Sequence, residues 1–300
     1  MPTIVYPYLA KVDDGKIVGW HGGFDNKKDF YKFGLKRPNA IFGEMALKPI
    51  SQAKNNKVGE NVYCGVMFPY FGHFILETLS CLPYVQPEDN LVFSNLGKGD
   101  ILDWQKEILT FIGIADRVLL VNKEPVEFDS LKHVPQASII NSYIGKDLIE
   151  YASKINSCNV LMDEDNYKKI YLSRSKVKNA NSVEELKLEE YFKSIGFKII
   201  YPEKISFKEQ VEIYRRANTI VSIEGSALHT LIFTSHKLKL YVIPRRKELA
   251  HNFLLQFFMQ NNICLNILSD FSGNAANFSA KPQLDTEAII DYFEGELQCQ

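Results

Sequence analysis

Residues Ile220–Phe233 read IVSIEGSALHTLIF, and this stretch decides the fold. Its β-branched, apolar beginning predicts a buried strand that ends at Ile223. The small-residue turn Glu224-Gly225-Ser226 follows at once, and we expect a helix from Ser226 to Phe233. The first N–H groups of a helix have no acceptor inside it. A strand that leads through such a turn into a helix therefore predicts an anion site.

Strand and helix patterns alternate on both sides of this stretch. The expected strands are 170–172, 197–201, 219–223, 239–243 and 263–268, and the expected helices are 182–196, 206–217, 226–233, 247–260 and 286–293. Ser206 with Glu209, and Ser182 with Glu185, fit the capping box that begins a helix. The buried face expected for helix 182–196 consists of Val183, Leu186, Phe192 and Ile195. This alternation predicts a doubly wound, Rossmann-like domain over 161–300.

The first half of the chain shows the same alternation less clearly. Strands are expected at 62–67, 91–94 and 117–121, and helices at 73–81, 101–112 and 143–155. The polar stretch 156–166 is the candidate linker. The predicted fold class is therefore α/β, with two Rossmann-like domains, 1–160 and 161–300, that face a central cleft. Open α/β sheets bind ligands at the carboxyl ends of their strands, so the cleft is the expected ligand site.

Composition narrows the class of protein. The chain has 300 residues, of which 46% are hydrophobic and 24% charged, and its net charge is −1. This composition is typical of a globular protein. A net charge near zero gives the protein no overall positive potential that would attract nucleic acid. The amino terminus lacks a signal-peptide pattern, and no apolar run reaches the ~18 residues of a membrane span, so we expect a cytoplasmic protein. Five scattered cysteines without a C-x-x-C motif predict reduced thiols rather than a metal site.

Several short motifs together carry a resemblance to a known family. They are Tyr171-Leu172-Ser173-Arg174, Gly196-Phe197, Glu209-Gln210, Glu224-Gly225-Ser226-Ala227-Leu228, and Tyr70-Phe71-Gly72-His73-Phe74 with Glu77. In this order they resemble glycosyltransferase family 61, whose bacterial members are often capsular polysaccharide biosynthesis proteins. The resemblance implies a two-domain GT-B architecture and inversion at the anomeric carbon. It also implies a nucleotide-sugar donor that is held mainly by the carboxyl-terminal domain.

The resemblance and the strand ends together select the donor-side candidates. They are Ser173, Arg174, Glu224, Gly225, Ser226, Ala227 and His229. Arg174 could bind a diphosphate with its guanidinium, or it could be a solvated loop arginine. Ser226 fits both a ligand-facing residue and an ordinary helix cap. His229 could reach the nucleotide, although a buried core histidine is the commoner case, and Arg245-Arg246 could bind phosphate or lie in a solvated turn.

Two positions depart from the family pattern. Glu224 stands where the family usually has His, and His229-Thr230 replaces the usual Leu-Asn. A carboxylate that faces the pocket would contact sugar or ribose hydroxyls, whereas a solvated turn acid would contact nothing. The departures also motivate an alternative function, a noncatalytic nucleotide- or glycan-binding protein of the same fold.

The catalytic candidates lie in the first half of the chain. Glycosyl transfer needs a base for the acceptor hydroxyl and positive charge for the departing diphosphate. His73, at the end of a strand, is the predicted base, and Glu77 one helical turn later would orient it or act as the base itself. The competing interpretations are a capping or packing histidine and an ordinary surface carboxylate.

The sequence therefore predicts an inverting glycosyltransferase that extends a bacterial capsular or lipopolysaccharide glycan. Its partners would be a nucleotide diphosphate sugar, as co-substrate rather than cofactor, and a glycan or lipid-linked glycan acceptor. No nucleic-acid partner is expected, because the net charge is −1 and no basic and aromatic residues interleave. No metal site is expected either, because Asp163-Glu164-Asp165 has the D-x-D spacing but lies in the polar linker. The implied pathway is compatible with peripheral attachment at the inner membrane.

Overall fold

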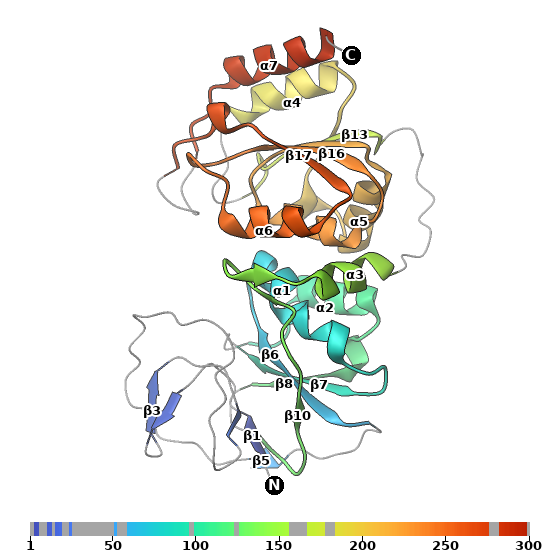
Figure 1. The fold of residues 1–300 in the computed structure, drawn as a ribbon, viewed down its shortest axis with the longest axis vertical. Helices are drawn as coiled ribbons and strands as arrows, with labels where there is room; N and C mark the ends of the chain where they lie inside the picture. The colour runs from blue at the N-terminus through green and yellow to red at the C-terminus, as the bar shows by residue number, and fades with distance from the viewer. Residues whose placement is uncertain are drawn as a thin grey trace. The chain divides into compact units, whose positions relative to one another are not determined.

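The computed structural model describes residues 59–95, 99–122, 126–155, 167–177, 184–275 and 282–298, and several short strands before residue 53 (Figure 1). The chain forms two compact units, Met1–Tyr151 and Ala152–Gln300, which we describe separately. The units divide within helix α3 (Lys146–Lys154). The domain boundary expected between 160 and 161 falls outside the described residues and stays a prediction.

The second unit is built on a sheet of five strands in the order β14-β13-β15-β16-β17, all of them parallel. The strands are β13 (Lys169–Leu172), β14 (Lys198–Ile200), β15 (Thr219–Ile223), β16 (Leu238–Ile243) and β17 (Ile263–Ile267). The central strand β15 pairs with β13 and β16, so that Tyr171, Val221 and Tyr241 lie side by side. This order confirms the parallel sheet that the alternating pattern predicts.

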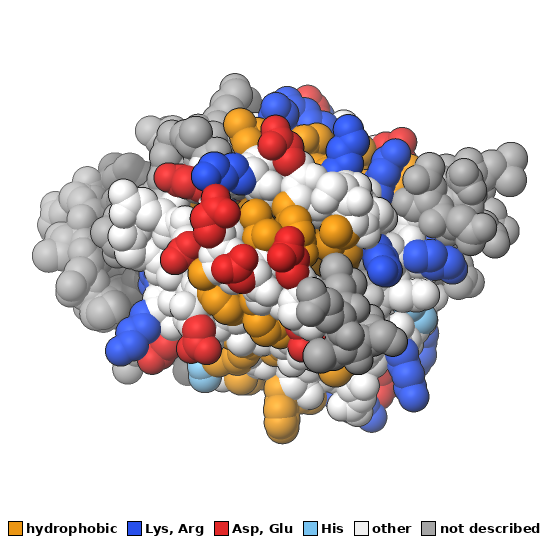
Figure 2. All heavy atoms as spheres, turned by 90° about the horizontal axis from the view of Figure 1, so that it is seen from above, with side chains coloured by type: hydrophobic (Ala, Val, Ile, Leu, Met, Phe, Trp, Pro, Cys, Tyr) orange, Lys and Arg blue, Asp and Glu red, His pale blue; other side chains and the backbone are white. Residues whose placement is uncertain are grey.

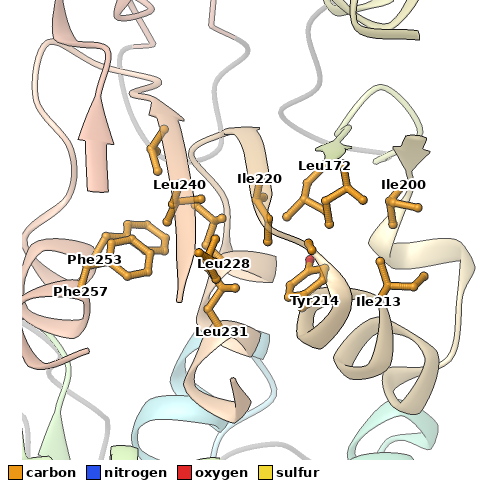
Figure 3. Close-up of a cluster of buried hydrophobic side chains, with 14 of the residues drawn as sticks. Leu172, Ile200, Ile213, Tyr214, Ile220, Leu228, Leu231, Leu240, Phe253 and Phe257 are labelled. Carbon is orange, nitrogen blue, oxygen red and sulfur yellow. The ribbon is translucent and has the colours of Figure 1, made fainter. Parts of the chain in front are cut away.

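Successive strand residues point to opposite faces of this sheet, and each face is buried under helices. One face carries Leu172, Ile220 and Leu240, which pack with residues of α5, η5 and α6 (Figure 3). The opposite face carries Tyr171, Val221 and Tyr241, which pack with residues of α4 and α7. The helical segments are α4 (Glu185–Ser194), α5 (Phe207–Arg216), the 3₁₀ helix η5 (Ser226–Phe233), α6 (His251–Met259) and α7 (Thr286–Gln298). Helices on both faces of a parallel sheet form a three-layer, Rossmann-like unit.

The first unit contains a second parallel sheet, in the order β10-β6-β7-β8. Its strands are β6 (Asn61–Met67), β7 (Asn90–Asn95), β8 (Val118–Val121) and β10 (Lys132–His133). Its helical segments include α1 (Phe71–Leu76), the 3₁₀ helix η1 (Thr78–Tyr84) and α2 (Asp103–Ile112). A smaller mixed sheet has the order β4-β1-β9-β5, with β1 (Thr3–Val5), β4 (Phe24–Asp25), β5 (Ser51–Gln52) and β9 (Val126–Phe128).

Several helices differ from the prediction. The expected helix 73–81 is instead α1 followed by η1, with the change at Glu77. The expected helix 226–233 is a 3₁₀ helix, and residues 143–144 of the expected helix 143–155 form a strand. In α4, Leu186 is 46% exposed and Leu188 is fully buried, so the predicted apolar face was wrong at Leu186, whereas Phe192 is buried and Ile195 packs against the same core, as predicted. Val183 and Ser182 lie outside the described residues.

Acidic side chains gather on the surface that carries α4 and α7. Figure 2 shows them around exposed apolar side chains on this face. Helix α7 contributes the exposed residues Glu287, Asp291 and Glu294 and contains no lysine or arginine. Across the part of the chain that the structure describes, none of the helices has the length and apolar character needed to cross a bilayer.

Candidate functional site

Two glutamates one turn apart on α4 hold the turn that follows β13. Oε1 of Glu185 accepts the backbone N–H of Arg174 at 2.8 Å and the hydroxyl of Tyr171 at 3.1 Å. Oε1 of Glu189 accepts the hydroxyl of Ser173 at 2.6 Å and that of Ser175, and its Oε2 accepts the hydroxyl of Tyr201 at 2.7 Å. Residues four apart lie on the same face of a helix, so one helix fixes the whole turn.

These contacts change the role that the sequence suggests for Glu185. The expected capping box would use its carboxylate at the start of its own helix, but the carboxylate instead binds the turn after β13. Glu185 is fully buried, and its burial raises the pKa of the carboxyl group to about 7, against the opposing effects of its two hydrogen bonds and of the Arg174 charge. Ser173 is also buried, so its hydroxyl serves the turn rather than an open surface.

The side chain of Arg174 lies across Gly225, on the neighbouring strand end. A β-carbon at residue 225 would stand 2.0 Å from Nη1 of Arg174, so this close approach requires glycine. The backbone of Gly225 is extended, with φ −170°, and the requirement is therefore steric rather than conformational. Nε of Arg174 is buried and makes no hydrogen bond among the residues that the structure describes. Burial lowers the pKa of Arg174, while the negative charges of nearby carboxylates oppose that shift.

Glu224 is buried and binds the loop that follows β16. Its Oε2 accepts the backbone N–H of Arg245 at 3.0 Å, and its Oε1 accepts that of Ala250 at 3.0 Å. With 2% of its surface exposed, Glu224 is not the solvated turn acid that was one of its two expected roles. Its contact with a donor stays a prediction.

Arg245 adds a buried arginine near the partly buried Arg174. It is 5% exposed, and its pKa is lowered first by burial and then by the positive charge of Arg174. Glu224 opposes this shift, but both of its oxygens already bind backbone N–H groups. The carboxyl ends of β13 and β16 therefore bring the positive charges of Arg174 and Arg245 near each other. The sequence left the role of Arg245 open, because only the fold places it near Arg174.

The remaining donor-side candidates begin η5. Ser226 is exposed and Ala227 is partly buried at its first turn. His229 is buried, with Nδ1 2.6 Å from Oε1 of Gln256 and Nε2 3.0 Å from Nδ2 of Asn252, and its ring stacks on Phe253. Both ring nitrogens are engaged inside the second unit. His229 is thus a core histidine in this structure, and its predicted contact with a nucleotide stays untested.

His73 and Glu77 form a hydrogen-bonded pair in the first unit. Nδ1 of His73 lies 2.5 Å from Oε2 of Glu77, and Oε1 of Glu77 accepts the backbone N–H of Ile140 at 3.1 Å. Because an ionised carboxylate only accepts, a neutral His73 ring beside it carries its proton on Nδ1 and offers Nε2 as the proton acceptor. The His73 side chain is 21% exposed, and its ring lies 5.3 Å from that of Phe68. This arrangement suits a general base oriented by a carboxylate.

The metal-binding side chains of the described residues do not form a cluster. Within those ranges, no three His, Cys, Asp or Glu side chains gather so that they could hold a metal ion. Cys64, Cys81 and Cys264 are free thiols. Asp163-Glu164-Asp165, Cys158 and Cys299 lie outside the described residues. A separate surface pocket, lined by residues that include Asn218, Lys237 and Asn262, lies at the opposite, amino-terminal ends of the strands.

We compared the sequence with those of known proteins and with models of protein families. No curated protein matches the chain. The model of the family described as Glycosyltransferase 61 matches residues 71–241, more than half of the sequence. The match includes the His73–Glu77 pair, the turn after β13 and the start of η5, whereas Arg245 lies beyond it. The chain belongs to glycosyltransferase family 61.

Proposed function

We propose that this glycosyltransferase moves a sugar from a nucleotide diphosphate donor to a growing bacterial surface glycan, with inversion at the anomeric carbon. The observation that carries the proposal is the Arg174 guanidinium beside Gly225. It is partly buried, its Nε has no hydrogen-bond partner among the described residues, and a second, buried arginine lies nearby. Buried cations are normally matched by negative charge. A bound diphosphate would supply that charge.

The proposed reaction is a single displacement. Nε2 of His73 takes the proton of the acceptor hydroxyl, and the hydroxyl oxygen attacks the anomeric carbon. The bond from that carbon to the diphosphate breaks, and the departing diphosphate retains the electron pair. Arg174 and Arg245 stabilise the negative charge that develops on it. Glu77 holds the His73 ring in the tautomer that accepts a proton.

This mechanism assigns the acceptor side to the first unit and the donor side to the second. We propose that the two units act as the halves of a GT-B enzyme. The acceptor would be a glycan or lipid-linked glycan, handled on the cytoplasmic side of the inner membrane. The acidic surface of α4 and α7 would repel anionic lipid, so peripheral membrane attachment would use a different surface (Figure 2).

A thermal-shift and transfer screen over nucleotide sugars, with and without Mg²⁺, tests the proposal. We expect at least one nucleotide sugar to raise the melting temperature and to be hydrolysed or transferred. If none binds and none is consumed, the proposal is wrong. If one binds but no acceptor from a broad panel is glycosylated, the noncatalytic binding protein becomes the better description.

The Arg174→Ala variant tests the donor side. It should weaken binding of that nucleotide sugar at least about tenfold, because a charge-assisted contact contributes about 1.5–3 kcal/mol. Lys176→Ala is the matched control, since it removes an exposed positive charge two residues away. Equal affinity in Arg174→Ala and the parent would remove Arg174 from this role.

A further inference from the structure

Glu185 combines complete burial with one unused oxygen. Oε1 accepts two hydrogen bonds, from the backbone of Arg174 and from Tyr171, whereas Oε2 is buried and has no hydrogen-bond partner among the described residues. A protonated carboxyl group keeps its accepting oxygen and carries the proton on the other one. Glu185 can therefore gain a proton on Oε2 while both bonds that hold the turn remain.

The charged and titratable groups around Glu185 determine how its protonation changes the local charge. Tyr171 on β13 and Arg174 in the turn face its carboxylate, and Glu189 on α4 adds a negative charge nearby. From α7, which packs on α4, Glu287 pairs with Lys187 at the surface. The guanidinium of Arg174 also feels Glu203 and Glu224. Protonation of Glu185 thus removes one of several negative charges close to Arg174.

Building on the proposed function, we propose that Glu185 is a positioning residue that takes up a proton from solvent when an anionic donor binds beside Arg174. The bound diphosphate adds negative charge near a buried carboxylate, which favours its neutral form. Binding is then coupled to formation of the O–H bond on Oε2. By linkage, affinity for the donor falls as the pH rises through neutrality, because the charged form of Glu185 must then be neutralised or tolerated.

The first arm of the test needs no donor. Burial holds the pKa of Glu185 at about 7 in the folded chain, above its ordinary value of 4.5. The folded chain therefore binds the extra proton between these values, and stability present below pH 4.5 is lost as the pH rises through 7. Between pH 5 and pH 8 the melting temperature of the parent should fall at least about 5 °C more than that of Glu185→Gln.

Glu190→Gln is the matched control for this arm, because it removes an exposed carboxylate from the same helix. Its melting temperature should follow the parent at every pH. Identical profiles for the parent and Glu185→Gln would overturn the proposal. If Glu185→Gln does not fold, a ¹³C NMR titration of the glutamate side chains in the parent replaces it. No carboxyl group titrating near pH 7 would then be the contrary result.

The second arm uses UDP-glucose, UDP-galactose, GDP-mannose and dTDP-rhamnose as probes, whose diphosphate diesters do not titrate near pH 7. Calorimetry at pH 7 in two buffers of different ionisation enthalpy should reveal proton uptake by the parent and none by Glu185→Gln. From pH 6 to pH 8 affinity should fall about threefold to tenfold in the parent and less than twofold in the variant. Binding without proton uptake would refute the role of Glu185 and leave the proposed function intact. Absence of any binding would refute both.

Discussion

At the scale of single residues, the proposed donor side depends on the Arg174 side chain filling the space that a β-carbon at residue 225 would need. Arg174 reaches Gly225 because residue 225 has no β-carbon, and the turn that carries Arg174 is fixed by Glu185 and Glu189. The guanidinium is thus placed before any ligand arrives. A preorganised cation loses little freedom on binding an anion, which makes it effective in an active site.

Gly225→Ala should displace Arg174 without unfolding the chain. The added methyl group would meet Nη1 at 2.0 Å, while the extended backbone at this position tolerates alanine. We expect donor affinity to fall about as far as in Arg174→Ala, with a melting temperature close to that of the parent. Gly99→Ala is the control, because a β-carbon at residue 99 would meet no atom within 4 Å. Unchanged donor affinity in Gly225→Ala would contradict this account.

The His73–Glu77 pair should affect turnover rather than donor binding. His73→Ala should lower kcat by about 10²–10⁴-fold, the usual contribution of a general base. Glu77→Gln should lower it less, because the amide can still contact Nδ1 but no longer favours the required tautomer. Steady-state kinetics with donor binding measured separately would check both. A loss of donor affinity that matches the loss of kcat would argue against a role as base.

Residue roles were predicted unevenly from the sequence. The spacing of His73 and Glu77 on one helical face indicates their contact, and the structure places them 2.5 Å apart. The partners of Glu224 and Glu185 were harder to predict, because a carboxylate at a turn or a helix start has several possible local partners. In the structure these carboxylates instead bind backbone N–H groups that are distant in the sequence, those of Arg245 and Arg174. Only the sheet order brings Arg245 near Arg174. Long-range pairs of this kind leave no local periodicity to read.

At the scale of elements, helix ends follow local chemistry closely. Ser206 caps α5 and accepts the N–H of Glu209 at 3.2 Å, while the Glu209 carboxylate accepts the N–H of Ser206 at 2.9 Å, as the capping box predicts. Gly113 ends α2 with φ 83°, in the left-handed region that favours glycine. These signals were readable because they involve neighbours within a few residues.

Two glycines without close neighbours should respond to alanine with opposite signs. Gly113→Ala forces a β-carbon into the left-handed conformation and should lower the free energy of unfolding by about 1–2 kcal/mol. Gly295→Ala, within α7, should raise it by about 0.5–1 kcal/mol, because alanine favours the helix. Urea unfolding of both variants measures this. Changes of the same sign would contradict the conformational explanation.

The 3₁₀ segments show that the sequence predicted a helix at 226–233 with the correct bounds but did not predict its type. The periodicity of 226–233 suits a helix, but over so short a segment the three-residue repeat of a 3₁₀ helix is hard to distinguish from the 3.6-residue repeat of an α-helix. The same ambiguity divides the expected helix 73–81 at Glu77. There the Glu77 carboxylate binds the distant backbone of Ile140, a contact that is invisible in a local window.

At the scale of the whole molecule, each unit has its own parallel sheet and buried side chains. In the second unit, the neighbouring residues Tyr171 and Leu172 of β13 pack into opposite layers. Both faces of the sheet are therefore buried, as expected for strands that are apolar throughout. The α/β fold class could be predicted from the sequence because strand patterns and helix patterns alternate along the chain. The arrangement of charges at the strand ends was not, since it depends on which strands become neighbours.

Replacing a core phenylalanine with alanine should reduce stability much more than replacing a surface phenylalanine. Phe192 is fully buried and packs against the rings of Tyr171, Phe197 and Phe293, so Phe192→Ala should cost about 3–5 kcal/mol of unfolding free energy. Phe258 is 82% exposed, and Phe258→Ala should change stability by less than about 0.5 kcal/mol. Denaturant unfolding monitored by circular dichroism would distinguish them. Similar losses would mean that Phe258 is covered in solution.

The close approach of Arg174 to Gly225 has a consequence for anyone who alters this enzyme. Any side chain at residue 225 would occupy the space of the Arg174 guanidinium. In a library that varies residue 225 alone, the measured effects will therefore mostly reflect displacement of Arg174 and not the properties of the new side chain. Substitutions at 225 become informative only when residue 174 is shortened in the same clone. The two residues, 51 positions apart in the sequence, therefore form a single unit of design.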